Sequence, residues 1–129
     1  MNKVFIVVGS TRPRRIGSQV AEWVLHNIPA SANLAAELVE LADWHLPLDD
    51  EPHIPATGEY VNEHTRAWSK KIASAQGFIF VTPQYNWGYP ASLKNALDHL
   101  FKEWNGKPAA IVSYGYHGGT KSAGRFAER

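Results

Sequence analysis

Three short segments of the 129-residue chain concentrate residues that bind anions and flat rings. The first, "GSTRPRRIG" at 9–17, places three arginines directly before a predicted helix and lacks the Walker A and GxGxxG patterns. A helix N-terminus disfavours each cation by about 0.3–1 kcal/mol, so the cluster indicates either a bound phosphate monoester or a solvated basic loop. The arginines are Arg12, Arg14 and Arg15, and nearby hydroxyl donors are Ser10, Thr11 and Ser18.

The second segment, "TPQYNWGYP" at 82–90, follows an apolar run and precedes another predicted helix. Prolines restrict its backbone at both ends, and Gly88 permits a ligand to approach the main chain closely. Tyr85, Trp87 and Tyr89 offer flat faces, and Asn86 offers a donor and an acceptor. These residues favour a surface for a planar heteroaromatic ring, with an aromatic cap over the core or an interface as the alternative.

The third segment, "SYGYHGG" at 113–119, is rich in small residues. Its glycines allow backbone N–H groups to approach the edge of a ligand. One phosphate-binding loop and two ring-binding loops together describe a mononucleotide site, and flavin mononucleotide (FMN) fits that description.

Alternating strands and helices must position these segments. Continuous apolar runs predict strands, and apolar residues at helical spacing predict the helices between them. This βα alternation with short connections predicts an α/β fold with a doubly wound parallel sheet, whose ligands bind beyond the carboxyl ends of the strands. The predicted strands are 4–8, 34–41, 77–81 and 109–114, and the predicted helices are 16–28, 60–75, 91–103 and a last one from about 119.

Composition narrows the function. The chain has a formal net charge of +1 and no cysteine, so it predicts no general attraction to nucleic acid and excludes thiol chemistry. Any redox activity must therefore use a cofactor. The apolar run at 4–8 is too short for a signal peptide or a membrane span, and we predict a cytoplasmic protein that binds neither membrane nor nucleic acid.

Other chemistries have weaker support. The six histidines form no HxH or HExxH pattern, so no metal site is predicted. His99 is interpreted as a surface or interface residue, and His117 as a possible substrate contact. The acidic run 49–51 is interpreted as a solvated loop, and no GxSxG pattern indicates a hydrolase.

The three segments resemble the NAD(P)H-dependent FMN reductase family, whose members include quinone, azo-dye and chromate reductases with a flavodoxin-like fold. The similarity extends through "LPLDDEP" and "YVNEHTRAWSKKI" and so covers nearly the whole chain. It implies FMN as cofactor and NADPH or NADH as electron donor. By resemblance, the phosphate is held by Ser10, Arg12, Ser18 and Gln19, the isoalloxazine ring is lined by Pro83, Gln84, Tyr85, Asn86 and Trp87, and its pyrimidine end is bordered by Ser113, Gly115 and Tyr116.

The implied activity is transfer of a hydride from nicotinamide to bound FMN and then of two electrons to a quinone-like or other small acceptor. No catalytic side chain is expected, because the protein positions and tunes the cofactor. The family frequently has Glu where this chain has Gln84. A flavodoxin-type electron carrier and a flavin-free fragment without activity remain alternatives.

The resemblance also implies five strands in the order 2-1-3-4-5, whereas only four are readable. We therefore expect residues 1–129 to form a single flavodoxin-like FMN-binding domain that is incomplete at its C-terminus, lacking the fifth strand and the last helix. The aromatic side chains of Tyr60, Trp87 and Tyr89 predict a homodimer or a higher homo-oligomer.

Overall fold

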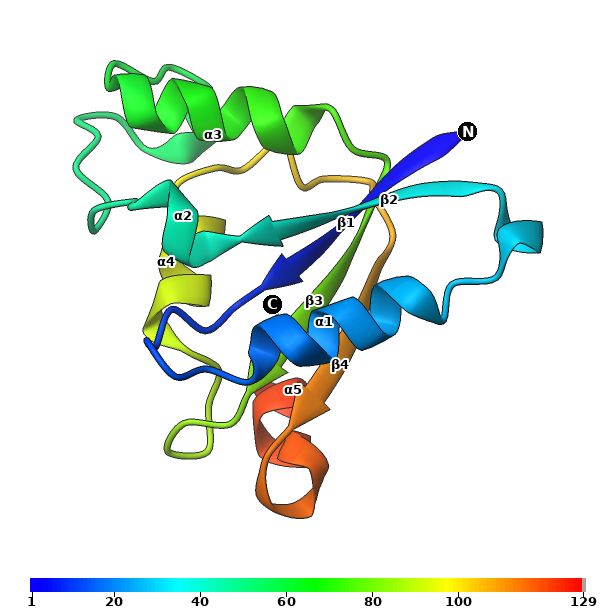
Figure 1. Ribbon diagram of the computed structural model, residues 1–129. Coiled ribbons are helices and arrows are strands. Elements are labelled where there is room, and N and C mark those ends of the chain that lie inside the picture. The colour runs from blue at the N-terminus through cyan, green and yellow to red at the C-terminus, as the bar shows by residue number, and fades with distance from the viewer. Residues whose placement is uncertain (129) are drawn as a thin grey trace.

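The computed structural model describes residues 1–128, in which four strands alternate with helices as predicted (Figure 1). Three short 3-10 helices, at 30–32, 55–57 and 116–119, lie in the connections. The strands are β1 (Asn2–Val8), β2 (Leu34–Glu40), β3 (Gly77–Pro83) and β4 (Ala109–Tyr114), and the α-helices are α1 (Gly17–His26), α2 (Leu41–Trp44), α3 (Glu63–Ala73), α4 (Ala91–Asp98) and α5 (Thr120–Ala127).

The four strands form one parallel sheet in the order β2-β1-β3-β4. This order confirms the predicted flavodoxin-like, doubly wound arrangement. In the register, Val8 of β1 lies opposite Val81 of β3, and Pro83 of β3 lies opposite Tyr114 of β4. The carboxyl ends of β1, β3 and β4 therefore share one edge of the sheet, and this edge carries all three segments singled out in the sequence.

Two apolar cores lie on the two faces of the sheet. On one face, α1 packs Ala21 and Val24 against Ile6 of β1, and Figure 1 shows this helix lying across the front of the sheet. On the other face, α3 and α4 pack against β1 and β3, around the fully buried Trp68. The indole N–H of Trp68 donates to the carbonyl oxygen of Ala96 at 2.9 Å and so joins α3 to α4.

Several sequence interpretations of single residues were wrong. The spacing of apolar residues in the predicted helix 60–75 places Val61 on its inward face, but Val61 is 48% exposed because α3 begins only at Glu63. The same spacing in the predicted helix 16–28 favours Trp23 as a packing residue, but Trp23 is 64% exposed on α1. His99, interpreted as a surface or interface residue, is fully buried just after the end of α4. Helix α4 is also shorter than the predicted 91–103.

No helix in the described part of the chain combines the length and the apolar character that crossing a membrane requires.

Candidate functional site

The three segments meet in a pocket of about 220 Å³ at the carboxyl edge of the sheet. Loop 9–16 forms one wall, and the ends of β3 and β4 form the other. The structure thus brings together parts of the chain that are more than one hundred residues apart. The pocket is lined by Ser10, Arg12, Arg14, Arg15, Ile16, Pro83, Tyr85 and Tyr114.

A partly buried hydrogen bond joins the first two segments. Ser10 is only 1% exposed, and its hydroxyl lies 2.7 Å from the hydroxyl of Tyr85. The backbone N–H of Arg12 donates to the same Ser10 oxygen at 3.3 Å, and the Arg12 guanidinium lies 5.9 Å from the centre of the Tyr85 ring. These contacts place a serine, an arginine and a tyrosine on one side of the pocket.

Positive charge near the N-terminal end of α1 is only partly neutralised. Arg15 pairs with Glu40 at 3.2 Å and also donates to the carbonyl oxygen of Arg12 at 2.9 Å. Within residues 1–128, no ion pair joins Arg12 or Arg14 to a carboxylate. Helix α1 begins at Gly17 with no acidic residue in its first turn and no side-chain cap. Its N-terminal N–H groups and two arginines therefore suit an anion from solution.

Tyr114 closes the pocket from β4 and was missing from the predicted site residues. Burial raises its pKa to about 12, with a smaller contribution from Tyr85 and an opposing one from Arg15. The phenol therefore remains a neutral hydrogen-bond donor at physiological pH. The sequence could have predicted Tyr114 as a site residue, because Tyr114 ends a predicted strand at the edge of the sheet where ligands bind. An added Cβ at Gly17 would lie 2.7 Å from the Tyr114 hydroxyl oxygen, so a side chain there would displace the phenol from its present position.

The second segment turns back on itself directly beside the pocket. The backbone N–H groups of Tyr85 and Gly88 donate to each other's carbonyl oxygens at 2.8 and 2.9 Å. Between them, Asn86 and Trp87 have φ angles of 47° and 69°, as in a type I′ turn. Asparagine tolerates this conformation, whereas a tryptophan there is strained, and such strain is typical of ligand sites. The Trp87 ring is 62% exposed and lies 4.8 Å from the Lys121 ammonium.

The Gln84 side chain faces α5. Its Oε1 accepts hydrogen bonds from the backbone N–H groups of Lys121 at 3.0 Å and Ser122 at 3.4 Å, in the first turn of the helix. The Ser122 hydroxyl in turn donates to the carbonyl oxygen of Pro83 at 2.8 Å. Gln84 therefore connects the second segment to the helix that follows the third.

The third segment forms an open loop after β4. Residues 117–119 all have positive φ angles, and the Ser113 hydroxyl donates to the carbonyl oxygen of Gly118 at 2.7 Å. Tyr116 at its tip is 89% exposed.

The pocket lining contains four of the twelve predicted site residues, Ser10, Arg12, Pro83 and Tyr85. Outside its lining are Ser18, Gln19, Gln84, Asn86, Trp87, Ser113, Gly115 and Tyr116.

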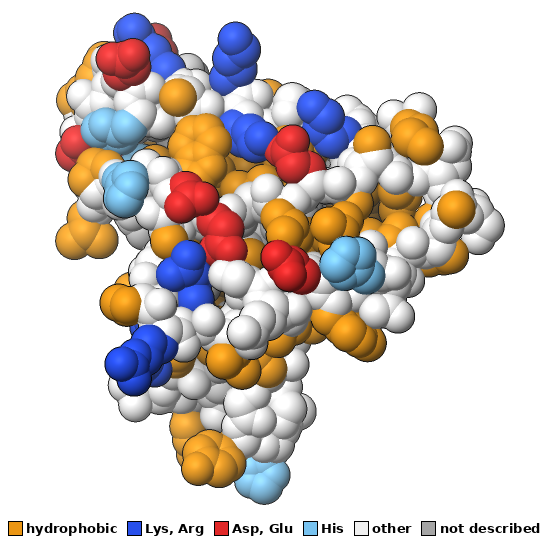
Figure 2. Space-filling model, in the orientation of Figure 1, with side chains coloured by type: hydrophobic (Ala, Val, Ile, Leu, Met, Phe, Trp, Pro, Cys, Tyr) orange, Lys and Arg blue, Asp and Glu red, His pale blue; other side chains and the backbone are white. Residues whose placement is uncertain are grey.

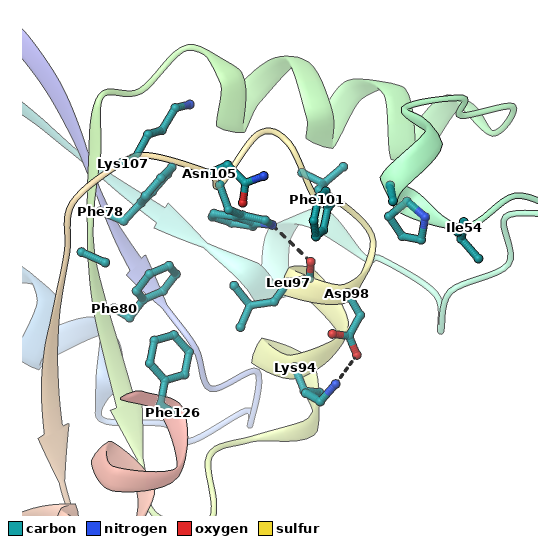
Figure 3. Close-up of a pocket in the computed structure, with 15 residues that line it drawn as sticks. Ile54, Phe78, Phe80, Lys94, Leu97, Asp98, Phe101, Asn105, Lys107 and Phe126 are labelled. Carbon is teal, nitrogen blue, oxygen red and sulfur yellow. Dashed lines mark hydrogen bonds and ion pairs between the residues drawn. The ribbon is translucent and has the colours of Figure 1, made fainter. Parts of the chain in front are cut away.

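A larger pocket of about 570 Å³ lies elsewhere and contains none of the predicted residues. Its wall is formed by Phe78, Phe80 and Phe126, as Figure 3 shows, and its rim carries the Lys94–Asp98 ion pair at 2.6 Å. This lining is mainly apolar, although Lys94, Asp98, Asn105 and Lys107 contribute to it, and none of the three sequence segments reaches it. We therefore place the functional site at the smaller, arginine-rich pocket.

Comparison with known proteins shows the family. A sequence model of the NADPH-dependent FMN reductase family matches residues 2–125. The chain belongs to this family. It is 53% identical to an NAD(P)H-dependent FMN reductase of Schizosaccharomyces pombe, over 96% of this chain and 63% of that protein. It is 44% identical to an NAD(P)H-dependent FMN reductase of Saccharomyces cerevisiae, over 98% of this chain and 72% of that protein.

More distant relatives extend the family toward quinone reductases. A quinone reductase of Escherichia coli is 35% identical over 92% of this chain, which spans 64% of that protein. Among solved structures, the flavoenzyme NAD(P)H:(acceptor) oxidoreductase FerB of Paracoccus denitrificans superimposes with a TM-score of 0.77 and 25% identity, over 99% of this chain and 70% of that one. FMN with NAD(P)H, the cofactor and donor predicted from the sequence, are those that define the family.

Proposed function

We propose that the pocket at the end of α1 binds the phosphate of FMN and that the loaded protein is an NAD(P)H-dependent oxidoreductase. The observation that carries the proposal is the presence of Arg12 and Arg14, without carboxylate partners in residues 1–128, at a helix N-terminus beside two tyrosines. Phosphate is the anion best matched to this combination of guanidinium groups, a hydroxyl and free N–H groups.

Each residue of the pocket has a distinct task in this proposal. Arg12, Ser10 and the first-turn N–H groups of α1 hold the phosphate, whereas the Tyr114 phenol donates a hydrogen bond from the β4 side. The strained turn at Asn86 and Trp87 presents a flat surface beside the ring. FMN, when bound, supplies the redox chemistry by accepting a hydride from NAD(P)H and passing two electrons to the acceptor. The protein contributes position and exclusion of water.

A quinone-like small molecule is the proposed acceptor. The support is the set of quinone reductases among the relatives, together with the absence of a predicted acid, base or nucleophile that a different chemistry would need. We also propose a homodimer, whose contact would involve the exposed rings of Trp87 and Tyr116. Tyr89 packs edge-on against Phe126 and is not part of the exposed aromatic area. Light scattering at micromolar concentration tests the dimer, and a monomer would contradict it.

Phosphate recognition is tested with Arg12→Ala and two ligands. Because a charge-assisted hydrogen bond contributes about 1.5–3 kcal/mol, the variant should bind FMN about tenfold to a hundredfold more weakly and riboflavin with little change. Lys70→Ala, which removes one positive charge from the exposed side of α3, should leave both affinities unchanged. Equal weakening of FMN and riboflavin by Arg12→Ala would contradict the phosphate assignment.

Enzymatic activity is tested separately by steady-state oxidation of NAD(P)H with a quinone and FMN-loaded protein. Continuous turnover without a second protein is expected. A flavoprotein that holds FMN but shows no such turnover would be an electron carrier, and that result would contradict the proposed activity.

A further inference from the structure

Outside the flavin pocket, two histidines and a carboxylate converge where α3, the end of α4 and the loop before α3 meet. One potential ligand atom each from Asp50, His64 and His99 lies within 4.8 Å of the other two. Figure 2 shows histidine and acidic side chains gathered on this side of the molecule, over α3 and the loop that precedes it. Asp50 and His64 are partly exposed, whereas His99 is fully buried.

His99 is the residue that distinguishes this cluster from an ordinary surface ion pair. Its Nδ1 lies 2.8 Å from the carbonyl oxygen of Asn95, one helical turn earlier, so Nδ1 carries the proton and donates. The other ring nitrogen, Nε2, is then a lone-pair acceptor. It is buried and, within residues 1–128, has no hydrogen-bond partner. A buried acceptor without a partner is costly, and native proteins rarely retain one unless a water, an ion or a functional role accounts for it.

The orientation of His99 is the one that metal-binding histidines adopt. Such a histidine donates its second ring N–H to a carbonyl or carboxylate, which fixes the tautomer and turns the free nitrogen toward the ion. His64 lies beside it, with ring centres 6.3 Å apart, and its Nε2 lies 2.9 Å from Asp50 Oδ1. A cation between these groups would replace the proton that His64 and Asp50 now share.

We propose that Asp50, His64 and His99 bind a divalent transition-metal ion of the Zn²⁺ type. Two imidazole nitrogens and one carboxylate oxygen suit Zn²⁺, whereas Mg²⁺ and Ca²⁺ prefer oxygen ligands alone. Tetrahedral coordination with bonds of about 2.0–2.1 Å needs ligand atoms about 3.3 Å apart, so the three side chains would move closer together from separations of up to 4.8 Å. The open side at Asp50 and His64 gives the ion access and leaves room for a water ligand.

The proposed ion would add to hydrogen bonds that already join these three elements. The Asn95 amide of α4 donates to the carbonyl oxygen of Pro47 in the loop at 2.9 Å, and the Trp68 indole of α3 donates to that of Ala96 in α4 at 2.9 Å. Asp50 belongs to the long loop between α2 and α3, His64 to the first turn of α3, and His99 to the end of α4. The loop exposes Leu48 and Ile54, at 80% and 71%, and therefore has little apolar packing of its own. A bound ion would hold this loop against both helices and stabilise the fold by mass action.

The test uses untagged full-length protein that has been treated with a chelator and then freed of it. Co²⁺ serves as the probe, because its visible absorption reports tetrahedral coordination by nitrogen and oxygen. Absorption should saturate at about one equivalent, and Zn²⁺ should displace Co²⁺. Added Zn²⁺ should also raise the melting temperature of the flavin-free protein, so the result does not depend on flavin binding.

Asp50→Asn and His64→Gln, at partly exposed positions where folding should survive, should each weaken Co²⁺ binding about tenfold or more. His53→Gln is the matched control, because His53 and Glu59 form another exposed histidine–carboxylate pair, at 3.9 Å. The control should retain wild-type Co²⁺ affinity and the Zn²⁺-dependent rise in melting temperature. Equal Co²⁺ affinity in Asp50→Asn, His64→Gln and the wild type, or no saturation at one equivalent, would overturn the proposal.

Discussion

Strands β1 and β4 have similar apolar sequences, yet the fold buries them to very different degrees. In β1, residues 4–8 are all buried, because β2 and β3 pair with its two edges and helices cover both faces. In β4, Ala109 and Ala110 are exposed and residues 111–114 are half-buried. Within residues 1–128, β4 pairs only with β3. Burial is therefore decided by neighbouring elements and not by the apolar character of the strand.

The strands also differ at the edge of the sheet where ligands bind. The ends of β1 and β3 are joined by the partly buried hydrogen bond between Ser10 and Tyr85. The end of β4 continues into an exposed loop that depends on glycine conformations. The candidate flavin site thus combines a firm side, which carries the arginines, and an open side, which carries Tyr116.

The largest effect is expected from shortening matched valines in the two strands. Val7→Ala in β1 should lower the free energy of unfolding by about 2–4 kcal/mol, because Val7 is 1% exposed and its removal leaves a cavity. Val112→Ala in β4 should cost less than half as much, because the site is half-buried and open to solvent. Urea denaturation measures both values. Equal losses would mean that β4 is buried in solution as deeply as β1.

A smaller difference in stability is expected between alanine substitutions at two glycines of the loop after β4. Gly118 and Gly119 have φ angles of 68° and 70°, which alanine adopts at a cost of about 1–2 kcal/mol. An added Cβ at Gly118 meets no atom within 4 Å, whereas at Gly119 it would lie 2.7 Å from the backbone oxygen of Tyr114. Gly119→Ala should therefore lower the free energy of unfolding more than Gly118→Ala. Thermal melts that give the same value for both would show that the loop shifts freely.

Much of this arrangement was predictable from the sequence, and the remainder was not for identifiable reasons. The four strands follow from local patterns, whereas their order was implied by the family resemblance. Arg12 and Tyr85 were predicted to lie at one site because the ends of parallel strands share one edge. The Gln84 side chain could not be placed, because its partner helix begins about forty residues later. His99 was misjudged because its burial depends on packing between α3 and α4, which no local pattern reports.

The acidic run 49–51 illustrates the same limit. The run was interpreted as a solvated loop. In the structure, the Glu51 carboxylate accepts hydrogen bonds from the backbone N–H groups of Val61 at 2.7 Å and Asn62 at 2.9 Å, just before α3. Asp50 pairs with His64 at 2.9 Å in the same region. A carboxylate near a helix N-terminus satisfies its free N–H groups, but sequence alone does not show which of three neighbouring acids does so.

On the firm side of the site, the Ser10–Tyr85 hydrogen bond should contribute about 0.5–1.5 kcal/mol to folding. A double-mutant cycle with Ser10→Ala and Tyr85→Phe should give a coupling free energy of this size, since each change removes one partner of a partly buried hydrogen bond. Ser113→Ala, which removes the more exposed bond to the Gly118 carbonyl oxygen, should change stability by much less. Additive effects of Ser10→Ala and Tyr85→Phe would show that the two segments are not coupled.

The smallest effect concerns pH and the segment that leads into β4. Glu103 is 4% exposed, and burial raises the pKa of its carboxyl. Hydrogen bonds from the hydroxyls of Ser69 and Tyr60 and from nearby backbone N–H groups outweigh burial and hold the pKa below 4.5. Because the unfolded chain then binds a proton more readily than the folded one, this contribution to stability is complete above about pH 4.5 and is lost as the pH falls through the lower, folded value. Since burial opposes the hydrogen bonds, the net contribution should be modest.

Urea denaturation at a series of pH values measures this contribution. As the pH falls, the free energy of unfolding should decline less steeply for Glu103→Gln than for Glu22→Gln, which changes an exposed position on α1. If both variants keep the wild-type decline, Glu103 does not link this segment to α3 through its charge.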